Sequence, residues 1–367
     1  MVPLLARHTI VLAQQQVIEL QQSHACPDAQ VRESVRAMRI ALLLLFVACT
    51  EPPPHVATGE LGPWQVGPAL PTPRANHCSA VIDDWVLVVG GNYMDSGAFV
   101  KTAEIHAARI EEGVLGNWRL AGMLPSPATE CSATSDGRTL YVLDGIYDDP
   151  AHGRQVWSAT LDETGHLGAL ASLGMLPATV VSSEATVHAD TLVLMDTRLP
   201  AEGNATVALQ SPITPSLAWQ TEELGIDFLA QAEYAFSADN VYTLGGYHDP
   251  AQGAVANVFV ARLMGGVARA TTPLPVPVGF GEAVAVDDWV FVVGGRAAVF
   301  GAPGTAQVFA AHATADGSLG AWRESALPMA RTNHELVVAG DYLVVTGGAV
   351  IGPGDATVFT AQVRWPP

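Results

Sequence analysis

The chain has 367 residues, of which 49% are hydrophobic and 14% are charged, so it can bury a large core and does not resemble a disordered protein. The formal net charge is -19, and Lys101 is the single lysine. No basic patch is visible, which argues against nucleic acid as a partner. Such acidity mainly keeps a protein soluble, and it leaves basic partners or cations open. The 35 glycines and 25 prolines suit the many turns of an all-β fold.

Residues 1–37 have mixed polarity and no strand pattern, and they precede a short apolar run. The run 38–49 starts with positive charge and ends in Phe46-Val47-Ala48-Cys49. It resembles a bacterial lipoprotein signal peptide, although Phe46 stands where the family usually has Leu. The run is shorter than the roughly 20 apolar residues that span a bilayer; the alternative is a buried strand or short core helix. A signal peptide belongs at the start of a chain, so residues 1–37 are expected to be an over-called start or unstructured.

The lipoprotein resemblance implies that residues 38–48 are removed and that Cys49 carries the lipid. Residues 49–60 then form an extended tether, which consecutive prolines stiffen. Thr50 follows Cys49 where Asp would favour the inner membrane, so we expect an outer-membrane lipoprotein or a secreted protein of the bacterial cell envelope. The lipid would be its only contact with the membrane.

Residues 61–367 contain one pattern six times. A Leu-Pro or similar step precedes a short apolar strand, a turn with Asp, a second apolar strand that often ends in Gly-Gly, a variable loop, a third strand and often a tryptophan. The residues that begin the first strands, here called anchors, are spaced by 53, 53, 49, 49 and 53 positions: Cys78, Cys131, Glu184, Glu233, Glu282 and Glu335. The turn of the second repeat looks one residue longer. A constant core with variable flanks is typical of repeated supersecondary units.

The second strands are continuous apolar runs, such as Val86–Val89, which is the pattern of a strand covered on both faces. Together with Pro73–His77, Asp84, Gly90-Gly91 and Trp118, they resemble kelch repeats of a β-propeller. The resemblance is strong in repeats 1, 5 and 6. It is weak in repeats 2 and 3, where Asp144-Gly145 and Asp196-Thr197 replace Gly-Gly. It implies an all-β, six-bladed propeller over residues 61–367, with four antiparallel strands in each blade around a central channel.

The last repeat ends after its third strand, and Leu61–Val66 has no repeat of its own. We expect this N-terminal segment to supply the fourth strand of the last blade. Such a strand would close the ring and cover an edge that would otherwise invite aggregation. The protein is expected to be a monomer.

The anchors and the residues that precede them are the candidate ligand-binding residues. In kelch-like propellers the first strand lines the channel, so equivalent positions converge there. Carboxylates and imidazoles in such a place could hold a cation or polar ligand, or perform acid-base chemistry; which metal, if any, stays unknown. The alternative is structural, because a glutamate at the start of a strand can accept backbone N–H bonds from the next blade. The candidates are His77, Glu130, Glu184, Glu233, Glu282, His334 and Glu335.

Cys78 and Cys131 occupy one repeat position in adjacent blades. In an oxidising compartment they could form a disulfide if their Cα atoms are closer than about 7 Å; a wider spacing of the inner strands would leave two thiols. A catalytic thiol is disfavoured, because neighbouring His77 should point to the opposite face of its strand.

The loops that follow the second strands should share one face of the propeller. Two of them contain Tyr-(Asp or His)-Asp-Pro-Ala, beginning at Tyr147 and Tyr247. A face built from loops fits a module that binds a protein or a glycan at the cell envelope; the loops could equally be solvated turns. The alternative function is a carbohydrate-active enzyme of the epimerase or lyase type, with carboxylates and histidines at the channel mouth. No phosphate loop or common metal motif is visible, and no cofactor is expected.

Overall fold

The computed structural model describes residues 58–178, 180, 183–197, 205–249, 251–298, 301–352 and 354–364. These residues belong to one compact unit. The predicted signal peptide, Cys49 and most of the predicted tether lie outside the described residues. Within the described ranges, no helix has the length and apolar character needed to cross a bilayer.

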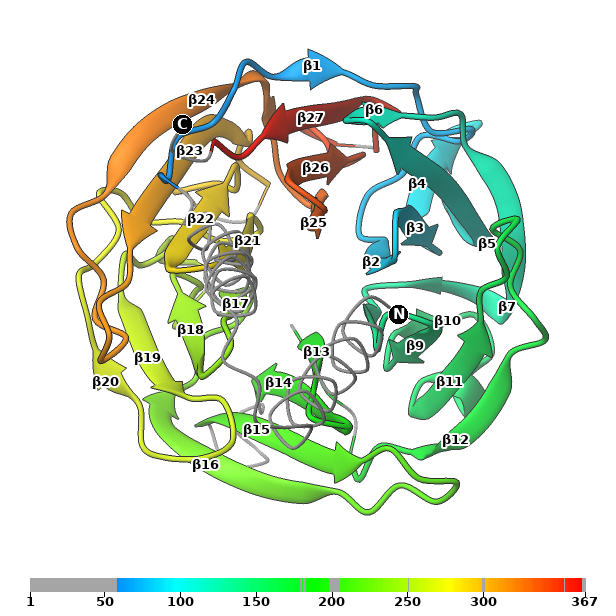
Figure 1. The fold of residues 1–367 in the computed structure, drawn as a ribbon, viewed down its shortest axis with the longest axis horizontal. Helices are drawn as coiled ribbons and strands as arrows, with labels where there is room; N and C mark the ends of the chain where they lie inside the picture. The colour runs from blue at the N-terminus through cyan, green and yellow to red at the C-terminus, as the bar shows by residue number, and fades with distance from the viewer. Residues whose placement is uncertain are drawn as a thin grey trace, which may run out of the picture. The chain divides into compact units, whose positions relative to one another are not determined.

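Antiparallel sheets make up the described chain and are arranged as blades in a propeller ring (Figure 1). Five sheets have four strands and one has seven. The first strand of each sheet lies innermost and the fourth lies outside (Figure 1). We number the sheets 1 to 6 by the order of their first strands along the chain.

Sheet 1 is the largest. Its four main strands are β2 (Cys78–Ile82), β3 (Trp85–Val89), β5 (Ala98–Glu111) and β7 (Arg119–Thr129). Three short strands extend it: β4 (Asn92–Asp95) and β6 (Val114–Leu115) pair with β5, and β10 (Ile146–Tyr147) pairs with β7. This sheet therefore departs from the predicted four strands, because two loops and the start of the next repeat's loop pair with its long outer strands.

Sheets 2 to 5 have the predicted four strands each. Sheet 2 contains β8 (Ser132–Ser135), β9 (Thr139–Leu143), β11 (Gln155–Thr160) and β12 (Ala171–Met175). Sheet 3 contains β13 (Glu184–His188), β14 (Thr191–Thr197), β15 (Ala205–Pro212) and β16 (Gln220–Asp227). Sheet 4 contains β17 (Glu233–Phe236), β18 (Asn240–Leu244), β19 (Val258–Arg262) and β20 (Arg269–Ala270). Sheet 5 contains β21 (Glu282–Val286), β22 (Trp289–Val293), β23 (Thr305–His312) and β24 (Arg323–Arg331).

Sheet 6 combines both ends of the described chain. Its strands β25 (Glu335–Ala339), β26 (Tyr342–Thr346) and β27 (Val358–Gln362) are joined on the outside by β1 (Gln65–Val66). The expected pairing is present: β1 runs antiparallel to β27, with Gln65 opposite Thr360 and Val66 opposite Phe359.

The second strands are largely apolar because each lies between two neighbouring sheets. In β3, Leu87 and Val89 belong to a buried cluster shared with Leu140 of sheet 2. The alternate residues Val86 and Val88 belong to another cluster, shared with Val344 of sheet 6. Successive side chains of a strand point to opposite faces, so a strand covered on both faces needs apolar residues at every position.

The strand pairing corrects one predicted anchor. Cys78 lies opposite Val89, and the four anchor glutamates hold the same place in their hairpins. In sheet 2, however, Ser132 lies opposite Leu143, so Ser132 rather than Cys131 is the equivalent residue. The reason is one additional residue in the connection from sheet 1 to sheet 2, which also aligns Asp144-Gly145 with Gly90-Gly91.

The two ends of the strands define two faces, which we name for use below. The mouth face is the end where first strands begin and second strands end. The turn face is the opposite end, where short turns such as Asp83-Asp84 and Asp287-Asp288 join first to second strands. The loops that follow the second strands therefore start at the mouth face.

The start of the described chain is attached at the turn face. The backbone N–H of Thr58 donates to the carbonyl of Arg364 over 2.9 Å, and Arg323 donates to the carbonyl of Thr58 over 2.9 Å. Gly59 packs so closely against Trp289 that a Cβ there would lie 2.1 Å from the ring. Thr58–Glu60, predicted as the end of the tether, is thus part of the packed structure.

Candidate functional site

A cavity of about 90 Å³ opens at the mouth face and is lined by residues from all six sheets. The structure brings every predicted ligand-binding residue to its wall: His77, Glu130, Glu184, Glu233, Glu282, His334 and Glu335. The repeat explains this convergence, because each of these residues lies at or just before the start of an innermost strand. Their binding role remains a prediction.

Several anchors link their own sheet to the next one. The side chain of Glu233 accepts a hydrogen bond from the backbone N–H of Gly281 over 2.7 Å. Ser132 donates from its hydroxyl to the carbonyl of Ser183 over 2.9 Å. In both pairs the partner immediately precedes the anchor of the following sheet. The anchor position therefore has a structural task as well as a place in the cavity wall.

The disulfide also joins an anchor to the residue that precedes the next anchor. Cys78 and Cys131 are bonded, with their Cα atoms 5.5 Å apart. Cys78 is the anchor of sheet 1, and Cys131 is the residue before the anchor of sheet 2. A covalent bond thus joins sheets 1 and 2 where a hydrogen bond joins sheets 4 and 5. The ring continues at the other side of sheet 1, where the Ser79 hydroxyl donates to Glu335 over 2.9 Å.

The two histidines face the preceding sheet rather than the open cavity. His77 is 2% exposed, and its Nε2 is hydrogen-bonded to Oγ1 of Thr346 over 2.8 Å. His334 is equally buried and lies against Gly294, where a Cβ would be 2.8 Å from its ring. Burial lowers the pKa of His77 well below its usual range and that of His334 to about 3; nearby Arg74 and Arg331 act in the same direction. Both imidazoles are therefore neutral at physiological pH.

The four anchor glutamates are protonated at neutral pH for the same reason, because burial disfavours the charged form of any group. Burial raises the pKa of Glu184 and of Glu233 to about 8. Burial, reinforced by the charges of the other anchor glutamates, raises the pKa of Glu282 and Glu335 well above the usual range. The acids and imidazoles of the wall are thus uncharged at neutral pH, and such groups can both donate and accept hydrogen bonds. Among the described residues, no group of three or more acidic, histidine or cysteine side chains is arranged to hold a metal ion.

A chain of amides, here called the rim, includes Asn76 and Asn333, which line the cavity. Asn333 donates to the side-chain oxygen of Asn76 over 2.6 Å, and Asn76 donates to that of Asn92 over 2.9 Å. Arg296 donates to the oxygen of Asn333. Both Asn76 and Asn333 have left-handed backbones, with φ of 50° and 55°, a conformation that asparagine tolerates better than most residues. The prediction missed these rim residues, although the repeated Arg-x-Asn-His motif contains both.

The repeated Tyr-x-Asp-Pro-Ala motif has a structural role. Tyr147 and Tyr247 are buried, 5% and 1% exposed. The aspartates at 149 and 249 accept the backbone N–H two residues later, over 3.0 and 2.9 Å, and so fix the turn. The motif therefore shapes two mouth-face loops, and its buried tyrosines are not presented to a ligand.

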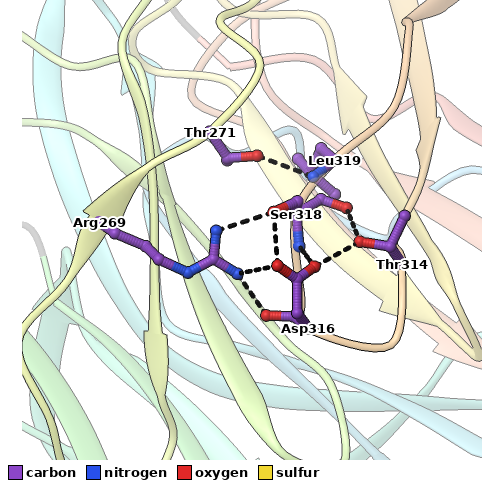
Figure 2. A network of polar contacts seen from close by, with 6 residues as sticks. All are labelled: Arg269, Thr271, Thr314, Asp316, Ser318 and Leu319. Carbon is purple, nitrogen blue, oxygen red and sulfur yellow. Dashed lines mark hydrogen bonds and ion pairs between the residues drawn. The ribbon is translucent and has the colours of Figure 1, made fainter.

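A second polar cluster joins sheets 4 and 5 on the turn face (Figure 2). Arg269 lies 3.3 Å from the carboxylate of Asp316 and donates to the hydroxyl of Ser318 over 2.8 Å. The backbone N–H of Leu319 donates to Thr271 over 2.7 Å. These contacts run from sheet 4 to sheet 5, so this cluster is best described as a link between neighbouring sheets.

The ring of sheets and the cavity at its mouth face together define the class of the protein as a β-propeller. A solved structure entitled "Structure of YjhT" is similar, with a TM-score of 0.62, over 81% of this chain and 99% of that chain. The sequence identity is 15%, so this likeness supports the fold alone. The chain matches no protein-family model and none of the curated proteins with which it was compared.

Proposed function

We propose that this protein is a binding module of the bacterial cell envelope, held by a lipid on Cys49, that recognises a macromolecule through its mouth face. In this proposal the ring is a six-bladed kelch-like propeller. The seven-stranded sheet is the first blade with added strands, and β1 closes the ring by pairing with β27.

The observation that carries the proposal is the contrast between the cavity and the surface around it. Pockets for small ligands usually measure about 300–1,000 Å³, whereas the mouth cavity measures about 90 Å³. Two of its four glutamates already bond to a neighbouring sheet. The surrounding loops, by contrast, expose large apolar side chains to solvent: Met94, Phe99, Ile146, Val350 and Ile351.

These features favour surface recognition over catalysis at the channel mouth. The alternative, a carbohydrate-active enzyme of the epimerase or lyase type, would need space for a sugar beside the acids and histidines. Exposed apolar side chains on loops are typical of sites that bind proteins, so a protein partner is favoured over a glycan.

The disulfide supports an envelope location. Disulfides persist in the periplasm and outside the cell and are rare in the reducing cytosol. The bond between Cys78 and Cys131 is therefore in keeping with export, as the proposed lipoprotein signal requires.

Whether the mouth face contacts the partner can be tested by photo-crosslinking in the native envelope. A photoreactive residue at Ile351, on the mouth face, should give a discrete adduct, whereas one at Val267, on the turn face, should not. Adducts from Val267 alone would overturn the proposal. Turnover of a sugar in a substrate panel by the purified protein would establish the enzymatic alternative.

A further inference from the structure

The most unusual surface element is a hairpin that the propeller does not need. In sheet 1, β5 has 14 residues, whereas its counterparts β15 and β23 have eight each. The additional residues pair with β4, from Asn92 opposite Lys101 to Asp95 opposite Ala98. Ser96 and Gly97 form the turn with φ of 50° and 88°, the left-handed pair typical of tight hairpins. We call Asn92–Lys101 the arm.

One face of the arm is apolar and exposed. Met94 and Phe99 lie directly opposite each other and are 37% and 68% exposed. Directly opposed residues of antiparallel strands point to the same face. They therefore form one contiguous apolar pair. Exposing this pair to water is unfavourable, and the propeller fold itself does not require it.

The apolar face continues across sheet 1, from β5 over β7 to β10. Thr102, Ala128 and Tyr147 are opposed in register across β5, β7 and β10, and all three are buried. Alternation places the side chains of Lys101 and Ile146 on the other, outward face. Phe99 is two residues from Lys101 and so shares that face. Ile146 shares it too; it is 53% exposed and lies two strand spacings, about 10 Å, from Lys101.

Acidic groups lie close to this face. Asp95, at the tip of the arm, is exposed and adjoins Met94 in the strand, with its side chain on the reverse face of the hairpin. The positive charge of Lys101 is neutralised by Asp148 at 3.1 Å, and the side chains of Asp148 and Asp149 are each 57% exposed. The patch thus combines an aromatic anchor and a flexible methionine with an excess of negative charge. Aromatic residues and methionine are typical of binding surfaces.

We infer that the arm, together with Ile146, is the docking surface for a protein partner that presents apolar side chains flanked by lysine or arginine. The inference rests on the proposed function and names its partner's chemistry. Charge complementarity selects this occupant: a second copy of the chain would bring the same acidic groups against these, with a net charge of -19 on each copy.

The test uses the purified protein with a synthetic probe, an acetylated octapeptide that alternates lysine with leucine and phenylalanine. Isothermal titration should show binding that weakens as salt rises from 50 to 500 mM. The variant Met94→Ser with Phe99→Ser should bind at least ten-fold more weakly without any change in charge. The matched control, Met264→Ser with Val267→Ser, removes a similarly exposed apolar pair from the turn face and should bind like the unchanged protein.

Three outcomes would overturn the inference. The arm variant could bind as tightly as the control, or the same peptide with glutamate in place of lysine could bind equally well. Alternatively, sedimentation could show a dimer that the arm variant abolishes, which would make a second copy the occupant. Thermal melting checks that the arm variant is folded, and crosslinking of the peptide from position 99 provides a readout that does not depend on that variant.

Crosslinking to the native partner distinguishes a failure of this inference from a failure of the proposed function. If crosslinks from Ile351 to the envelope partner persist in the arm variant, the mouth face binds but the arm does not select the partner. If they are absent in the unchanged protein as well, the proposed function itself fails.

Discussion

At the scale of single residues, the glycine pairs of the repeats make room for the next sheet. Gly347 has a φ of 59°, and a Cβ there would lie 2.5 Å from the carbonyl oxygen of Arg74 and 2.9 Å from the ring of His77. The Gly-Gly of one repeat and the Arg-x-Asn-His of the following one are thus two halves of a single contact between sheets.

This contact predicts a large effect of Gly347→Ala. Because the new methyl group would clash with backbone as well as adopt a left-handed conformation, the free energy of unfolding should fall by about 3 kcal/mol or more. The control Gly352→Ala has a φ of 81° but nothing within 4 Å, and it should cost about 1–2 kcal/mol. Urea unfolding measures both, and equal losses would show that the close approach is unimportant.

The disulfide makes a second residue-scale prediction. Replacing Cys78 and Cys131 by serine removes a crosslink across 53 positions, which should lower the free energy of unfolding by about 4 kcal/mol through the entropy of the unfolded chain. Denaturant unfolding of the unchanged protein with and without a reductant should give a similar difference. Identical midpoints in all three samples would contradict it.

At the scale of elements, β1 and the residues before it protect the outer edge of sheet 6. A chain that begins at Gly67 would lack β1 and the contacts of Thr58 and Gly59, and it would expose the edge of β27. Unpaired edges promote aggregation. We expect a lower unfolding temperature and faster aggregation on light scattering than for a chain that begins at Thr58. Equal behaviour of the two chains would mean that the pairing adds no stability.

The repeat pattern was sufficient to predict the main strands, because hairpin length and apolar alternation are local properties. It predicted β1 beside β27, since the last repeat lacks an outer strand. It misplaced Cys131 by one position, because counting between anchors cannot locate an additional residue in a connection. The added strands β4, β6 and β10 were missed, as their pairing depends on how far β5 and β7 extend.

The repeat pattern also predicted part of the site, but not its contacts. Equivalent positions of a ring converge, so His77, Glu184 and the other wall residues could be found by counting. Whether Glu233 bonds to Gly281 or faces a ligand depends on distances between sheets, which no sequence period contains. The same distances decide between two thiols and a disulfide.

At the scale of the whole molecule, the ring concentrates four acids in one small space, and this couples stability to pH. Glu184 and Glu233 have a pKa of about 8 in the folded protein, against 4.5 for an unperturbed glutamate. The folded state therefore holds protons that the unfolded state has lost. Their contribution is fully present below pH 4.5 and is lost as the pH rises to about 8.

The corresponding prediction compares the protein with the variant Glu184→Gln, Glu233→Gln. One pKa unit corresponds to about 1.4 kcal/mol, so the unchanged protein should lose at least about 2 kcal/mol relative to the variant between pH 5 and pH 8.5. Urea unfolding at several pH values measures this difference. A constant difference would mean that both carboxyl groups ionise normally.

The attachment of Thr58 at the turn face also sets how the molecule would stand on a bilayer. Nine chain steps separate Thr58 from Cys49, and an extended chain of that length reaches about 30 Å. With the proposed lipid on Cys49, the turn face would look towards the membrane. The mouth face, with its arm, would look away from it, towards whatever approaches through the periplasm or from outside the cell.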